Sequence, residues 1–135
     1  MKFGSVLAIG GILSVATVAS ANGNYLYGYA VGAFNCYTEY SGTTYIRVMT
    51  NVFEYCPYGG NAFNGSGFAQ NEVGGNMYNW ARMSCSGDLS NGNPYWQGAF
   101  SDPQAAYNSQ NTWCSNGQNC QHYTVSVYVP NVCNP

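Results

Sequence analysis

Aromatic side chains are the most evident chemical resource of this 135-residue chain. The sequence contains 13 tyrosines, three tryptophans and six phenylalanines, whereas only 6% of its residues are charged. Flat aromatic rings stack on the apolar faces of sugars, and asparagine, glutamine and aspartate side chains bind sugar hydroxyls. Because neutral carbohydrates require little charge in a binding site, this composition predicts a surface that contacts carbohydrate.

The side chains expected to contact a ligand lie in or near predicted turns and strand ends. Most other tyrosines are expected to fill the core of a leucine-poor domain and to form cross-strand pairs. Tyr25, Tyr27 and Tyr29 alternate and would share one face of a strand, although the sequence leaves open which face is buried. The expected stacking rings are Trp80, Trp96, Trp113, Tyr95 and Tyr58, and the expected polar contacts are Asn93, Gln97 and Asp102.

The sequence gives weaker evidence for catalysis than for binding. His122 is the only histidine, and no Gly-x-Ser-x-Gly sequence supplies a nucleophile beside it. Glycoside hydrolysis usually needs two carboxylates, and Glu39 and Glu54 flank a possible hairpin at Ser41-Gly42 that would bring them together. We expect a non-catalytic protein with no catalytic residue. A small secreted hydrolase that uses Glu39 with Glu54, or His122, is an alternative.

Charge is sparse and disfavours two classes of partner. Lys2 belongs to a predicted export signal, so Arg47 and Arg82 are the only cations of the mature chain, against five acids. Nucleic-acid binding requires cations that displace phosphate counterions, and attraction to an anionic membrane requires basic clusters. The expected partners are therefore a glycan or polysaccharide, or a surface protein of a host or competitor.

An export signal is predicted at residues 1–21. Lys2 gives it a positive start, residues 3–18 are apolar or small, and Ala19-Ser20-Ala21 is a small-x-small cleavage site. Cleavage would leave residues 22–135 as a single domain that is secreted to the extracellular space. No later stretch approaches the ~20 apolar residues of a membrane-spanning helix, so no membrane span is expected in the mature chain.

The cysteine content predicts a covalently stapled domain. An even set of cysteines in an exported chain favours three disulfides, and Cys114 and Cys120 are close enough in sequence to pair locally. We expect neither a metal nor a cofactor, because the chain has no Cys-x-x-Cys pair and one histidine. The six cysteines are Cys36, Cys56, Cys85, Cys114, Cys120 and Cys133.

Asn64-Gly65-Ser66 is a possible N-glycosylation site in a eukaryotic host.

Short strands are the elements expected to position these residues. Residues 43–56 alternate over a long run, and further candidate strands are residues 24–34, 76–85, 94–100 and 123–129. The Gly- and Asn-rich residues 58–75 and 101–111 are expected to be loops, with a short helical turn at residues 103–107. The predicted fold is all-β: a single small antiparallel β-sandwich or barrel-like domain stapled by three disulfides.

Two further function classes are compatible with the same features. A small disulfide-rich exported domain also fits a secreted effector or toxin that acts on a host or competitor protein, because protein interfaces favour tyrosine and tryptophan too. A structural wall protein would instead self-associate through its tyrosines.

Overall fold

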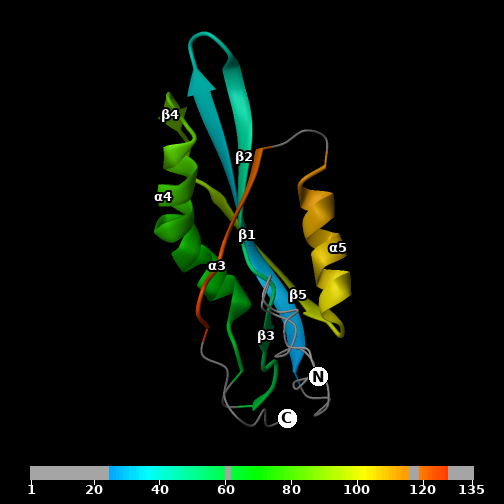
Figure 1. Cartoon of the computed structure of the whole chain (residues 1–135). Helices are drawn as coiled ribbons and strands as arrows, with labels where there is room; N and C mark the ends of the chain where they lie inside the picture. The colour runs from blue at the N-terminus through cyan, green and yellow to red at the C-terminus, as the bar shows by residue number, and fades with distance from the viewer. Residues whose placement is uncertain (1–24, 60–61, 116–118, 128–135) are drawn as a thin grey trace.

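The computed structural model describes residues 25–59, 62–115 and 119–127 of the chain. The predicted signal at residues 1–21 lies outside these ranges. Within these ranges, six strands and three helices follow one another (Figure 1). In order they are β1 (Leu26–Thr38), β2 (Gly42–Thr50), β3 (Phe53–Tyr55), α3 (Gly65–Gly74), α4 (Asn76–Met83), β4 (Asp88–Leu89), β5 (Asn93–Phe100), α5 (Pro103–Trp113) and β6 (Asn119–Tyr123).

All the described strands belong to one curled sheet built on β1. Strands β2 and β3 pair with one edge of β1, and strands β4 and β5 pair with its other edge. All four of these pairings are antiparallel. Val31 lies opposite Met49 and Gly28 opposite Phe53, so the β2–β3 side holds one extra residue, a bulge between the two strands. Strand β6 extends the sheet by pairing with β2 in a parallel orientation.

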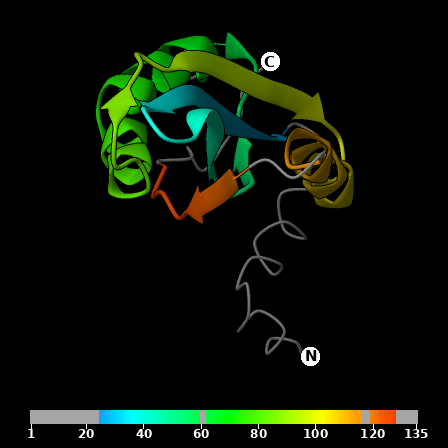
Figure 2. The same ribbon diagram turned by 90° about the horizontal axis from the view of Figure 1, so that it is seen from above.

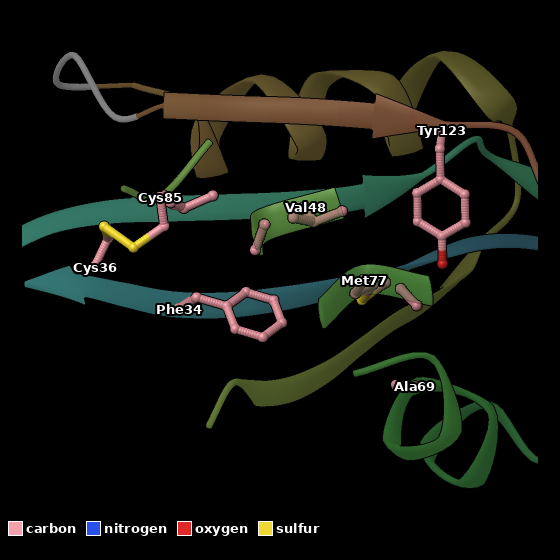
Figure 3. Packing of buried hydrophobic residues seen from close by; sticks show 10 residues of the cluster. Phe34, Cys36, Val48, Ala69, Met77, Cys85 and Tyr123 are labelled. Atoms are coloured by element: carbon pink, nitrogen blue, oxygen red, sulfur yellow. A yellow bond between two sulfur atoms is a disulfide. The ribbon is translucent and has the colours of Figure 1, made fainter. Parts of the chain in front are cut away.

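Helices cover both faces of this sheet (Figure 2). On one face, Ala69 of α3 and Met77 of α4 pack with Phe34 and Val48 from the strands (Figure 3). On the other face, Ala106 of α5 packs with a cluster that includes the three alternating tyrosines of residues 25–29. Successive residues of β1 therefore supply two cores, and both faces of the strand are buried over residues 27–32. Within the described ranges, no helix is long and apolar enough to cross a membrane.

The described residues are strand-rich, with 41% in strands, but 31% are in helices, so the all-β prediction is wrong for three segments. Residues 58–75, predicted as a loop, contain α3, and residues 76–85, predicted as a strand, contain α4. Residues 101–111 hold most of α5 rather than a single helical turn. In α4 the buried residues Met77 and Ala81 are four apart, which is the helical spacing that places them on one face.

The β-sandwich prediction is not confirmed. A sandwich packs two sheets together, whereas the described strands form one sheet, and the β2–β6 pair is parallel. The strand prediction for residues 43–56 is confirmed by β2 and β3, and those for residues 24–34 and 94–100 by β1 and β5. The last predicted strand, at residues 123–129, is shifted: β6 ends at Tyr123 and residues 124–127 form no strand, whereas residues 128–129 lie outside the described ranges.

Two disulfides are found in the described part of the chain. Cys36–Cys85 ties β1 to the end of α4, and Cys114–Cys120 closes the connection between α5 and β6, as the local spacing predicted. Three bridges were expected; Cys133 lies outside the described residues, and no described cysteine is free. Disulfides are typical of proteins in oxidising compartments, so these bridges are consistent with an extracellular protein.

Loss of the long-range disulfide is expected to destabilise the fold more than loss of the local one. The sequence separation is 49 residues for Cys36–Cys85 and six for Cys114–Cys120. Chain entropy gives a stabilisation of about 4 kcal/mol for the longer loop and about 2 kcal/mol for the shorter one. Urea unfolding should show this difference between the Cys36→Ala/Cys85→Ala and Cys114→Ala/Cys120→Ala variants. Equal losses would contradict it.

Candidate functional site

A groove opens between α5 and the sheet face that this helix covers. Residues opposite one another in paired strands share a face, so Tyr95, opposite Val31, and Arg47, opposite Ala33, both lie on this face. Strands β2 and β5 and helix α5 thus contribute to one hollow of about 650 Å³, here called the α5 groove. Its lining includes Arg47, Gln97, Asn108, Ser109, Thr112 and Trp113.

Trp113 lines the α5 groove and packs against Tyr95, which lies next to the described lining. The ring centroids of Tyr95 and Trp113 are 5.0 Å apart, with their planes tilted by 45°. Tyr95 is 39% exposed, whereas Trp113 is half-buried against the core. The guanidinium carbon of Arg47 lies 5.8 Å from the centroid of the Trp113 ring, which is within the range of a cation–π contact. Trp113 therefore supports both the exposed ring and the cation.

Hydroxyl and amide groups supply the rest of the lining. The buried Tyr29 hydroxyl lies 2.6 Å from the Ser109 hydroxyl, which fixes Ser109 against the sheet. Burial raises the pKa of Tyr29, so this phenol stays protonated at neutral pH. On the exposed side of α5, Gln104 donates a side-chain hydrogen bond of 3.1 Å to Asn108. The groove thus offers donors and acceptors beside an aromatic surface.

Three of the predicted ligand-binding residues, Trp113, Tyr95 and Gln97, come together here. Sequence reasoning missed the contributions of Arg47 and of Asn108 and Thr112. The alternation of residues 43–56 does place Arg47 on one face of a strand, but no strand pattern indicates that α5 lies above it. The two α5 residues are four apart and share a helix face, a spacing that had no meaning while their segment was predicted as a loop.

Trp96 points to the opposite face of the sheet from Tyr95, as alternation along a strand requires. Its ring packs in an aromatic cluster, with centroids 5.6 Å from Phe53, 5.2 Å from Tyr55 and 5.5 Å from Phe63. A Cβ atom added at Gly65 of α3 would lie only 2.2 Å from this ring. Trp96 is therefore half-buried in protein contacts beneath α3.

The remaining predicted contacts are spread over the surface. Trp80 stacks on Tyr123 at 5.5 Å, in a second hollow of about 580 Å³ that Glu72 and His122 also line. Tyr58 is exposed in the connection after β3, and Asn93 is exposed at the start of β5. Asp102 caps the first turn of α5 by accepting a 3.0 Å hydrogen bond from the Gln104 N–H. It therefore lies at the end of the helix remote from Trp113.

Asn64, the predicted glycosylation site, is exposed and forms the N-cap of α3. Its side-chain oxygen accepts a 2.9 Å hydrogen bond from the Gly67 N–H. The amide nitrogen, to which a glycan attaches, is not the atom used in the cap. An N-glycan at this position stays a prediction.

The structure does not bring together Glu39 and Glu54, the carboxylates of the alternative hydrolase interpretation. Glu54 lies opposite Tyr27, near the start of β1, whereas Glu39 follows the last residue of that strand, Thr38. At about 3.3 Å per residue, their positions along β1 are roughly 35 Å apart. His122 lies on β6, away from both carboxylates, and partial desolvation lowers its pKa. The described residues also contain no group of three or more His, Cys, Asp or Glu side chains that could hold a metal ion.

Comparisons with known proteins offer no relative from which a role could be transferred. The chain matches no protein-family model, no curated protein and no solved structure. Its function is therefore inferred from the geometry and chemistry of the side chains described above.

Glu54 is expected to make stability depend on pH. Burial raises the pKa of its carboxyl group, and the Oε2 atom is buried without a hydrogen-bond partner. Because the pKa is raised in the folded state, the ionised carboxylate destabilises the fold at a pH above that pKa. This destabilisation vanishes at a pH below the pKa of glutamate in the unfolded chain, about 4.3. Glu54→Gln should therefore increase the free energy of unfolding at pH 7 and leave it unchanged near pH 3.

Urea denaturation at the two pH values measures this effect. The matched control is Glu39→Gln, because Glu39 is an exposed carboxylate in the β1–β2 turn and its removal should change little at either pH. A gain from Glu54→Gln that is equal at both pH values, or a loss at pH 7, would contradict the assigned cause.

Proposed function

We propose that the protein is a secreted, non-catalytic carbohydrate-binding module and that the α5 groove is its binding site. The observation that carries this proposal is the Tyr95–Trp113 pair beside a polar lining. A sugar ring has an apolar face and a rim of hydroxyls, so it needs an aromatic surface and hydrogen-bonding groups in one place. Tyr95 supplies the exposed ring, and Gln97 and Asn108 supply amides.

The size of the groove supports this proposal. Ligand sites in proteins typically enclose about 300–1,000 Å³, and the groove measures about 650 Å³. Its components come from two strands and a helix held by the core, so the site is preorganised rather than formed by a long loop. Preorganisation lowers the entropy that binding would otherwise lose.

The lining also favours binding over hydrolysis. Glycosidases usually use two carboxylates on either side of the scissile bond. No Asp or Glu belongs to the described lining of the α5 groove. The disulfides and the predicted export signal support a site of action outside the cell.

Replacement of Tyr95 is expected to weaken carbohydrate binding. The oxidised mature protein, residues 22–135, is first screened against soluble glycans and insoluble polysaccharides, and calorimetry then gives the affinity for each hit. Tyr95→Ser should reduce that affinity at least tenfold, about 1.4 kcal/mol, because it removes the exposed ring. Trp113→Ala should have a similar effect, although part of its cost is lost packing against the core.

Trp80→Ala is the matched control, since it removes an equally exposed aromatic ring from a different hollow. A folded protein that binds no saccharide, or whose affinity survives Tyr95→Ser, would overturn the assignment of the groove.

A second candidate function, that of an effector acting on a protein, is favoured by the β1–β2 hairpin. This hairpin extends beyond α4 and α5 (Figure 1). Tyr37 is 51%, Tyr40 100% and Tyr45 53% exposed, so three rings gather at its tip. Exposed tyrosines of this kind are enriched at protein interfaces, whose cores are depleted of charged residues.

Replacing the three hairpin tyrosines by serine separates the two functions. If the protein acts on a surface protein, the variant should lose capture of that partner from a surface-protein extract, while Tyr95→Ser should retain it. Carbohydrate binding should instead be retained by the triple variant and lost in Tyr95→Ser. Capture that survives the triple replacement would remove the hairpin from consideration.

A further inference from the structure

We infer that the α5 groove takes a saccharide that carries a carboxylate, with Arg47 as the group that binds the anion. This inference rests on the proposed carbohydrate binding and specifies its substrate class. It starts from the chemistry of one side chain, because Arg47 is the only cation in the described lining of the groove.

The guanidinium of Arg47 has no anionic partner among the residues that the structure describes. Its recorded contact is with the ring of Trp113, and its Nε atom is buried without a hydrogen-bond partner. A buried donor that has lost water and gained no acceptor is unfavourable, and more so in a charged group. A ligand that brings an acceptor into the groove would remove this cost.

Arg47 is not needed to cap the C-terminus of α5. The last carbonyls of the helix already accept hydrogen bonds from the residues that follow it. Cys114 N–H donates to the carbonyls of Gln110 and Asn111, and both the N–H and the hydroxyl of Ser115 donate to the carbonyl of Thr112. Arg47 is therefore available to a ligand rather than used as a helix cap.

The acidic residues of the domain are placed elsewhere. The Glu72 carboxylate accepts a hydrogen bond from the Tyr123 hydroxyl in the second hollow, and Asp102 caps the opposite end of α5. Glu39 and Asp88 border a third hollow at the base of the hairpin turn. Glu54 lies near the start of β1, opposite Tyr27. The cation in the α5 groove is thus left without a neutralising side chain.

A sugar carboxylate suits this arrangement better than a neutral sugar does. The planar guanidinium presents its donors as a fork that matches the two oxygens of a carboxylate. In a uronic acid the carboxylate is attached to the pyranose ring itself, so one residue can contact Arg47 while its ring reaches Tyr95. Because the chain has a net charge of −2, such a ligand would be held by this local contact and not by the overall field.

The test uses oligomers of glucuronate, galacturonate and mannuronate, each paired with its methyl-esterified form, and the oxidised mature protein. Calorimetry should show that at least one acid binds tenfold or more tightly than its own ester. Arg47→Gln should abolish that preference, and Arg47→Lys, which keeps the charge without the fork, should retain part of it. Arg82→Gln is the control, because Arg82 lies on α4 and donates to the Gly87 carbonyl.

The possible failures are distinguishable. If esters bind as tightly as acids, or if Arg47→Gln retains the preference in a protein whose urea midpoint is unchanged, the acidic-sugar inference is overturned while carbohydrate binding stands. If the folded protein binds neither these oligomers nor any neutral saccharide of the earlier screen, the proposed function falls, and this inference falls with it.

Discussion

Burial of residues 27–32 of β1 on both faces, with pairing along both edges of the strand, is the constraint on which the rest of the structure depends. A strand in this position must supply apolar or small side chains at nearly every residue, and β1 does so with tyrosines toward α5 and small residues toward α3 and α4. Because its backbone is hydrogen-bonded on both sides, every other strand except β6 takes its register from β1. The helices then complete two separate cores in a domain with few leucines.

Much of the strand content was predictable because alternation is a local property. The long run at residues 43–56 became β2 and β3, and the close spacing of Cys114 and Cys120 predicted their bridge correctly. The helices were missed because α3 contains several glycines and all three helices contain asparagine. Both residues have low helix propensity, and packing against the sheet holds the helices in place. One signal was present: Asp102 followed by Pro103 is a typical helix start, and α5 begins there.

The candidate site was predictable in its chemistry but not in its assembly. Composition indicated aromatic rings and amides, yet only tertiary structure determines that Tyr95 and Trp113 meet while Trp96, one residue away from Tyr95, is enclosed on the other face. The role of Arg47 was hidden for the same reason. Whether an arginine is paired, capping a helix or available to a ligand depends on neighbours from distant parts of the chain.

The long-range pairing of β1 with β5 has a consequence for the order of folding. Ala33 pairs with Asn93, so a chain segment of about 60 residues must be closed before this edge of the sheet can form. The α5 groove takes Arg47 from within that segment and Tyr95 and Trp113 from beyond it, so the groove is complete only when the segment has closed. Ligand binding would therefore report the fully assembled native state, and by mass action a bound ligand would stabilise that state as a whole.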